Sequence, residues 1–502
     1  MRFKSVASDR DLDVAELGPN LKTHAVRSGA AVVVGQAGVA LIGLGAVAVL
    51  ARLLQPADFG LVAMALPIIV IATVLRSFGL DVGTIYREQL DATLVNSVFW
   101  TSLALNFSLT LVLAALAPIL AWFYGEPRLV KLTIALAGGA LLLNLGAQPE
   151  TLLKRQMRFH WLAFISLVAA LTGAVVAVVM AKLGAGYWAL AFQTIVTFLV
   201  RSLLAWVFCD WRPSSPRAVR SDARLRAMLA SGRNLTSTRL LHLSASYFDR
   251  VIVGWLGGAA VLGLYENGRR IAFLALDTLY APLLDVGVAG FSRASRDGLQ
   301  YRAFGIKAVQ LVLALMLPSL IFLLLEVRPI TLVLLGKQWL PAVPYARWLI
   351  GAALAQSLSR TLMWFYLSTD RTAQQMRWFT MQSAVLILSV TIGAWLGGVY
   401  GVAVAVAVAT WTLTIPAIIY GLRESPFSAG DFAGASAWPI LFSLAAAVCL
   451  LVWEWIAPWS WTPLNHCLSA AGIYFLIYVG VWFVSPGSRA AGRQILQLLL
   501  KR

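Results

Sequence analysis

Charged residues are scarce in this chain, at 12% of its 502 residues, whereas a globular domain carries about 25%. Hydrophobic residues make up 60% and gather in apolar stretches that recur almost from end to end. A membrane span needs roughly 20 mostly apolar residues, and about 14 stretches meet that length. This composition excludes most soluble enzymes.

Cysteine is also rare, with three scattered residues at Cys209, Cys449 and Cys467 and no CxxC or metal-binding spacing. Neither a disulfide framework nor a zinc site is indicated. A glycine-rich phosphate-binding loop is missing from the sequence too, so ATP hydrolysis is not expected. A membrane glycosyltransferase or polymerase usually carries a sizeable outer loop with catalytic residues, and the loops expected outside are short here. We therefore expect no enzyme, no cofactor and no metal.

Basic residues outnumber acidic ones, 40 to 22, for a net charge of +18. In a chain with this many spans, the excess is more typical of loops facing anionic lipid than of a nucleic-acid partner. Lys and Arg alternate between rich and poor loops, and the positive-inside rule then predicts that both termini are cytoplasmic. The Trp-rich turn 453–461 would lie in the outer interface as an aromatic belt.

Three short motifs occur twice in the same order, which favours an internal repeat over chance similarity of glycine-bounded hairpins. The pairs are 156–159 (QMRF) with 375–378 (QMRW), 183–187 (LGAGY) with 396–400 (LGGVY), and 54–60 (LQPADFG) with 256–263 (LGGAAVLG). Each copy contains an even number of spans, so both copies have the same orientation. Parallel repeats of this kind form a binding cavity where they meet and open it alternately to each side.

The predicted fold is an all-α integral membrane protein with two pseudo-repeated six-helix lobes and two C-terminal helices. Its parts are a cytoplasmic segment 1–25, an N-lobe 26–210, a cytoplasmic linker 211–228, a C-lobe 229–425, helices 13 and 14 in 434–485, and a cytoplasmic tail 486–502. Pro56, Gly60, Gly257 and Gly263 would shape the turns about which the lobes move.

Several motifs together resemble the polysaccharide-transporter branch of the multidrug/oligosaccharidyl-lipid/polysaccharide exporter superfamily. They are 51–60 (ARLLQPADFG), 186–190 (GYWAL), 247–257 (YFDRVIVGWLG) and 262–265 (LGLY). The resemblance extends over about residues 25–425. It implies two six-helix bundles around a central cavity in the bacterial cytoplasmic membrane, and a polyprenyl-diphosphate-linked oligosaccharide as substrate. Asp249 and Arg250 are the residues that it carries over best.

Polar and charged residues inside the expected spans are the candidate site, because a charge at mid-membrane costs roughly 2.5–3.5 kcal/mol and normally faces protein or water. In the span 229–256, Asn234, His242 and Asp249 form one helical stripe with Arg239 and Arg250 beside it. The next spans add Glu266, Arg270, Asp277, Gln356 and Arg360. The first lobe supplies mostly neutral groups, namely Gln36, Asn96, Asn106 and Asn144.

A diphosphate needs arginine partners when it leaves water, and hydroxyl-rich sugars suit neutral amides. The predicted substrate-binding residues are Arg239, Arg250, Arg270, Arg360, His242 and Asn234. Asp249, Asp277 and Glu266 are protonatable, so they are candidates for coupling transport to an ion. Two alternatives stay open: Glu266 and Arg270 neutralise each other at their i,i+4 spacing, or Asp249 and Arg250 form an interfacial pair at a helix end.

Together with the resemblance, these residues predict a flippase that moves a lipid-linked oligosaccharide outward for extracellular polysaccharide assembly. The alternative is a multidrug or cation antiporter of the same superfamily, which would be expected to show a mainly acidic cavity. The expected partners are the lipid-linked substrate, membrane lipids, and a polysaccharide polymerase or export machinery. We expect no nucleic acid and a monomeric protein.

Overall fold

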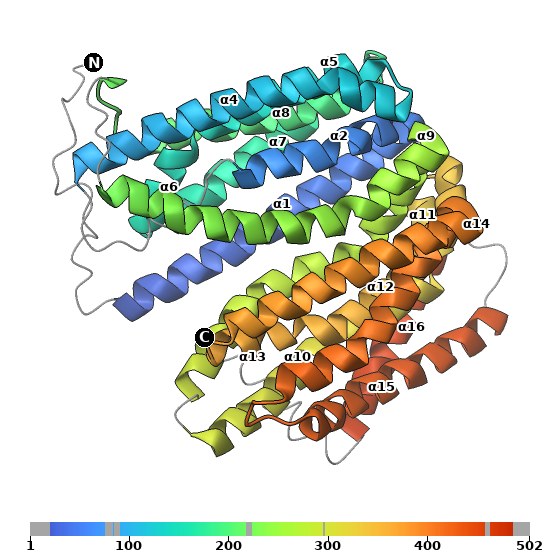
Figure 1. The fold of residues 1–502 in the computed structure, drawn as a ribbon. Coiled ribbons are helices and arrows are strands. Elements are labelled where there is room, and N and C mark those ends of the chain that lie inside the picture. The colour runs from blue at the N-terminus through green and yellow to red at the C-terminus, as the bar shows by residue number, and fades with distance from the viewer. Residues whose placement is uncertain are drawn as a thin grey trace. The chain divides into compact units, whose positions relative to one another are not determined.

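The computed structural model describes residues 21–75, 84, 91–216, 223–294, 297–456 and 462–484, without the side chains of 21–33, 72 and 484 and of most of 223–242 and 281–294. All regular structure in these ranges is helical. The chain divides into two compact units, the first ending at Gly263 and the second beginning at Leu264 (Figure 1).

The first unit is built from long, nearly all-apolar helices that pack along one another. They are α1 (Leu21–Leu53), α2 (Pro56–Leu75), α4 (Ala92–Tyr124), α5 (Arg128–Leu145), α6 (Ala147–Arg155), α7 (Phe159–Lys182), α8 (Tyr187–Phe208) and the part of α9 (Ala223–Ala294) up to Gly263. Short turns join α1 to α2, α4 to α5 and α7 to α8, because backbone groups in hydrocarbon must be paired within a helix. Gly125 ends α4 in the left-handed conformation, where its N–H reaches the carbonyls of Ala121 and Trp122.

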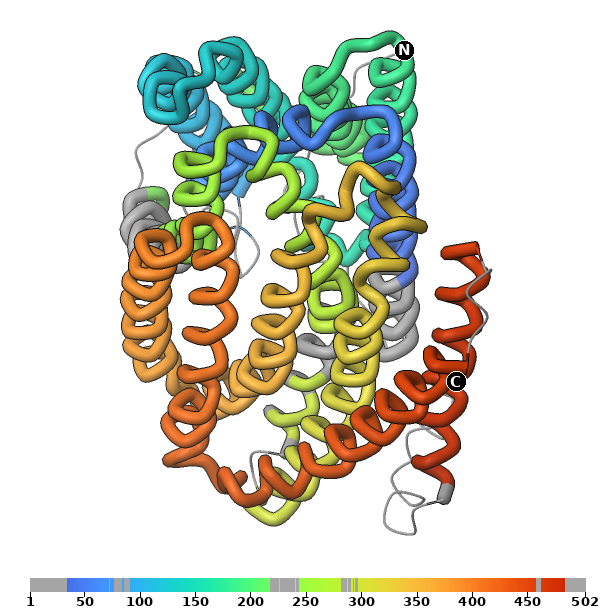
Figure 2. Tube along the Cα trace, turned by 90° about the vertical axis from the view of Figure 1, so that its right-hand side faces the viewer, coloured from blue at the N-terminus to red at the C-terminus, as the bar shows by residue number. Residues whose placement is uncertain are grey.

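The second unit has the same helical character. Its elements are the rest of α9, α10 (Gly298–Leu325), α11 (Val327–Leu334), the 3₁₀ helix η3 (Lys337–Ala342), α12 (Val343–Arg360), α13 (Leu362–Ser368), α14 (Thr372–Leu422), α15 (Ala429–Ile456) and α16 (Pro463–Val484). Asp297 caps α10 by accepting a hydrogen bond from the backbone N–H of Leu299 at 2.9 Å. Figure 2 shows α15 and α16 in red beside α10 in yellow.

Eleven helices of the described ranges are long and apolar enough to cross a membrane. Large apolar side chains stay on their outer surface, among them Trp395 at 84% exposure, as expected of a surface that faces lipid. The chain is therefore an all-α multi-pass membrane protein. Two of the eleven, α9 and α14, are each two helices joined at glycines, and α12 is too polar to count. The figure of 14 spans stays a prediction.

The backbone repeats a turn at two of the motifs. Gly186 before α8 has φ 56° and ψ −133°, and Gly398 inside α14 has φ 56° and ψ −140°. Only glycine takes this conformation readily. The backbone conformation therefore matches Gly186 to Gly398. The aligned letters of the two motifs would match Gly186 to Val399, one position later.

A second pair of turns corrects the register of the QMR motif. Met157 before α7 and Asp370 before α14 both have positive φ, 55° and 54°. An arginine follows each of them, and the helix then begins at Phe159 or Thr372. The residues 375–377 lie inside α14, so they do not correspond to 156–158. The lobe boundaries stay a prediction.

The starts of α2 and of the second part of α9 approach each other without side chains between them. A Cβ atom on Gly60 would overlap the carbonyl oxygen of Ala259, and one on Gly263 would overlap that of Pro56. The contact is reciprocal, since Gly60 lies four residues after Pro56 and Gly263 lies four residues after Ala259. Gly258, rather than the expected Gly257, bends α9 here, with φ 68° and ψ −173°.

We predict that Gly60→Ala destabilises the protein, because a backbone oxygen cannot rotate away from the new methyl group. Overpacking a close contact costs about 1–3 kcal/mol, and opposed backbones leave little room to relax. The thermal unfolding midpoint in detergent measures the effect. Gly45→Ala is the matched control, since its Cβ would meet nothing within 4 Å. Equal midpoints for the two variants would contradict the close contact.

Candidate functional site

Arg360, the last residue of α12, is fixed by groups of α9 and α12 that lie in the second unit. Its Nη1 lies 3.1 Å from Oδ1 of Asp277, and its guanidinium stands 5.4 Å over the ring of Tyr280. The Tyr280 hydroxyl donates to the carbonyl of Arg360 at 2.8 Å, and Nη2 of Arg360 donates to Oε1 of Gln356 at 3.4 Å. Two predicted site residues, Arg360 and Asp277, are thus brought together.

The Arg360 side chain keeps 30% of its surface exposed and that of Asp277 keeps 64%. A guanidinium held in this way is orientated before an anion arrives, and it presents a planar fork that suits phosphate oxygens. The Asp277 carboxylate is a weak competitor because it is exposed to solvent. The arrangement can therefore exchange an internal carboxylate for an anionic ligand.

Asp249 and Arg250 are buried, at 5% and 7% exposure. Oδ1 of Asp249 accepts a hydrogen bond from the backbone N–H of Arg250 at 2.9 Å, and the Arg250 guanidinium lies 4.0 Å over the ring of Tyr247. This pair differs from Arg360 in its burial, because the Arg360 side chain is partly exposed and can be reached by a ligand. Contact between Arg250 and a ligand would require the surrounding helices to move.

The remaining predicted residues fall into two groups. On α9, Arg270 is exposed and Glu266, four residues earlier, is half-buried. The side chains of Asn234, Arg239 and His242 lie outside the described residues, although α9 includes their positions.

An ion pair of the first unit, with a buried carboxylate, was not predicted, since mostly neutral polar groups were expected there. Arg201 of α8 donates from Nε and Nη2 to the two carboxylate oxygens of Glu150 on α6, at 2.6 and 3.0 Å. Glu150 is 4% exposed. The signal was present, because Arg201 is a charge in the middle of an apolar stretch.

Three of the neutral groups expected in this unit are hydrogen-bonded. The Asn144 amide donates to Oδ1 of Asn106 at 2.6 Å, which joins α5 to α4. Oδ1 of Asn96 accepts from the backbone N–H of Ser214 at 2.9 Å. Gln36 is exposed on α1. The asparagines therefore connect elements of the first unit.

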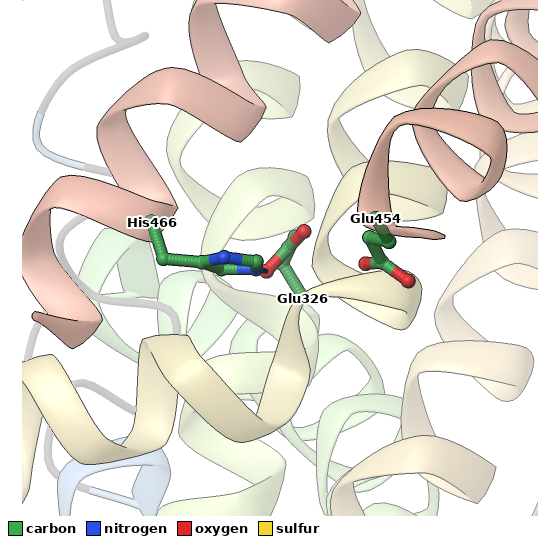
Figure 3. Close-up of side chains that lie close together, drawn as sticks. All are labelled: Glu326, Glu454 and His466. Atoms are coloured by element: carbon green, nitrogen blue, oxygen red, sulfur yellow. Dashed lines mark ion pairs between the residues drawn. The ribbon is translucent and has the colours of Figure 1, made fainter. Parts of the chain in front are cut away.

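One group of side chains has the composition of a metal site. Glu326, Glu454 and His466 come from three different helix ends of the second unit, and their ligand atoms lie within 4.8 Å of one another (Figure 3). No metal was expected from the sequence, because short spacings between ligand residues indicate a metal site and these three residues are far apart in the chain.

The fold and these paired charges define a class, an all-helical membrane protein with arginine–carboxylate pairs inside its helix bundles. The chain is similar in structure to the lipid II flippase MurJ in an inward closed conformation, with a TM-score of 0.70 and 15% sequence identity. The likeness covers 90% of this chain and 98% of that one. At this identity it establishes the fold alone.

Residues 49–344, more than half of the chain, match the family described as "Polysaccharide biosynthesis protein", and the chain belongs to that family. It is 29% identical over 304 residues to the succinoglycan biosynthesis transport protein ExoT of Rhizobium meliloti (strain 1021), 59% of this chain and 60% of that protein. It is 22% identical over 369 residues to the lipopolysaccharide biosynthesis protein WzxC of Escherichia coli (strain K12), 72% of this chain and 74% of that protein. The chain therefore spans about 60% of the length of the first of these relatives.

We predict that Glu150→Gln lowers the unfolding midpoint, because it removes the charge that compensates Arg201. The loss of a charge-assisted contact costs about 1.5–3 kcal/mol. The double variant Glu150→Gln/Arg201→Gln should recover part of the loss, since no uncompensated charge stays behind.

The exposed pair Glu126–Arg128, with N–O distance 3.0 Å, supplies the control. Glu126→Gln should lower the free energy of unfolding by less than about 1 kcal/mol, as is typical of surface pairs, and its midpoint should therefore change little. If Glu150→Gln were as mild as Glu126→Gln, the pair would not contribute to stability.

Proposed function

We propose that this protein moves an oligosaccharide linked to a polyprenyl diphosphate across the bacterial cytoplasmic membrane for extracellular polysaccharide assembly. The observation that carries the proposal is the partly exposed Arg360, orientated by Asp277 and Tyr280 within a membrane helix bundle. Membership of the polysaccharide biosynthesis family and the functions for which the two relatives are named support the choice of substrate.

In the proposed mechanism the diphosphate displaces the carboxylate of Asp277 and binds the guanidinium of Arg360. Charge-assisted hydrogen bonds to phosphate are stronger than neutral ones, so they compensate for the lost hydration. The protein then alternates between states open to either side, and Asp277 takes back the guanidinium when the substrate leaves. Gln356, which accepts a hydrogen bond from Arg360, and Arg270, about two turns before Asp277 on α9, are the groups suited to further sugar and phosphate contacts.

The other predicted residues keep their proposed roles. Arg239, Arg250, His242 and Asn234 would contact the substrate as the helices rearrange, and Asp249 and Glu266 join Asp277 as proposed coupling groups. We also propose a monomer that works beside a polymerase or an export complex. We do not propose an enzymatic function, because the first of these relatives is named as a transport protein.

We predict that Arg360→Ala reduces transport of a diphosphate-linked oligosaccharide lipid in proteoliposomes by roughly tenfold or more. Loss of one charge-assisted contact of about 1.5–3 kcal/mol corresponds to that factor or a larger one. Transport is measured as the fraction of labelled lipid that becomes accessible to an external sugar-modifying enzyme.

The matched control is Arg347→Ala, which removes an exposed arginine from the same helix α12. Its transport should stay near that of the wild-type protein. Equal activity of the two variants would remove Arg360 from the mechanism but leave the transport function standing. Efflux of organic cations without lipid transport would instead support the antiporter.

We predict that the turn after α7 faces outward and the turn before α14 faces the cytoplasm, as the distribution of basic residues indicates. In a background without Cys449 and Cys467, Gly184→Cys should react with a membrane-impermeant maleimide in intact cells. Thr372→Cys should react only after permeabilisation. The opposite pattern would invert the proposed topology.

A further inference from the structure

Three helix ends of the second unit meet at Glu326, Glu454 and His466. Glu326 lies at the junction of α10 and α11, Glu454 in the last turn of α15, and His466 in the first turn of α16. The His466 backbone N–H donates to the carbonyl of Thr462 at 3.0 Å, which fixes the backbone of His466 in that first turn. Figure 3 shows the imidazole beside the carboxylate of Glu326, with Glu454 on the other side.

Glu326 is the most deeply buried of the three, and its side chain is 1% exposed. Neither of its carboxylate oxygens accepts a hydrogen bond from the described part of the chain. Its ion-pair partner there is Nε2 of His466, at 3.4 Å from Oε2, and the carboxylate of Glu454 lies close by as well. Burying an ionised carboxylate without donors costs several kcal/mol, so the position requires either a compensating positive charge or a proton.

His466 cannot supply this compensation alone. Even with a protonated imidazole, two carboxylates and one histidine leave a net negative charge, and the two carboxylates repel each other at this separation. A divalent cation between them would compensate for the excess. The three side chains also supply the oxygen and nitrogen ligands that zinc and similar ions prefer.

The distances fit such an ion. With metal–ligand bonds of about 2.1 Å, two ligands of a tetrahedral site lie roughly 3.4 Å apart. The Nε2 of His466 and Oε2 of Glu326 are 3.4 Å apart already. Glu454 is half-buried at the end of its helix, so its carboxylate has room to complete the set from within 4.8 Å.

We propose that Glu326, Glu454 and His466 bind one divalent transition-metal ion of the zinc type, with a water molecule in the fourth position. The ion would connect α15 and α16 to the end of α10, along which these two helices already pack. The hydroxyl of Tyr478 on α16 donates to the carbonyl of Ala314 on α10 at 2.8 Å, so the same helices are joined further along the interface. The role is structural and independent of the proposed transport function.

The test is zinc binding by the full-length protein, purified in detergent with a tag that contains no histidine and treated with a chelator. Isothermal titration calorimetry and metal analysis should find one zinc per chain, and added zinc should raise the unfolding midpoint. His466→Ala and Glu454→Gln should abolish both the binding and the shift.

Two variants control for other histidines and acids. His160→Ala changes an exposed histidine of α7, and Glu424→Gln changes an exposed acid that accepts a hydrogen bond from Gln374. Both should retain one zinc and the full shift. This comparison excludes zinc held at unrelated surface groups.

Absence of zinc binding by the wild-type protein would overturn the proposal, whatever the stability of the variants. The same conclusion would follow if His466→Ala bound zinc as the wild type does. Glu326→Gln distinguishes a buried proton from a metal, because the amide mimics a protonated carboxyl group. If this variant matched the wild-type midpoint in the presence of zinc, the group would share protons instead of binding a metal.

Discussion

Every backbone amide that enters the hydrocarbon of a membrane must be hydrogen-bonded within the protein, and the rest of this structure depends on that constraint. It makes the chain helical almost throughout its described ranges and confines irregular backbone to short turns. Where a helix must bend, glycine supplies the conformation, as Gly258 does in α9 and Gly398 in α14. The reciprocal approach at Gly60 and Gly263 has the same origin, since two helix backbones meet closely only where neither carries a side chain.

Charges enter such a structure only where another group compensates for them. Glu150 with Arg201, Asp277 with Arg360, and Glu326 with His466 are three separate solutions to that problem. The three differ in how far their carboxylates are exposed, and this difference assigns their roles. In the first pair the carboxylate of Glu150 is buried, in the second the carboxylate of Asp277 is exposed and can leave Arg360, and in the third two carboxylates face a single histidine. An anion suits the second, and a cation suits the third.

The sequence predicts the helical membrane class, the family resemblance and several turn glycines, because these follow from local composition and short motifs. It names Asp277 and Arg360 separately, but their contact joins residues 83 positions apart and depends on how α9 packs on α12. Glu150 was missed because it lies next to an expected loop, where an acid is unremarkable. The register of the QMR motif was wrong, since identical letters occupy different backbone positions. Glu326, Glu454 and His466 were not connected, because no local pattern links three helix ends.

The central claim is that an anionic lipid headgroup is the ligand, and equilibrium binding tests it most directly. The measurement is the dissociation constant of the purified protein for a polyprenyl diphosphate, compared with the corresponding monophosphate and with a lipophilic organic cation. The account predicts that the diphosphate binds most tightly and that inorganic pyrophosphate competes with it. Preferential binding of the cation, with no competition by pyrophosphate, would contradict the account.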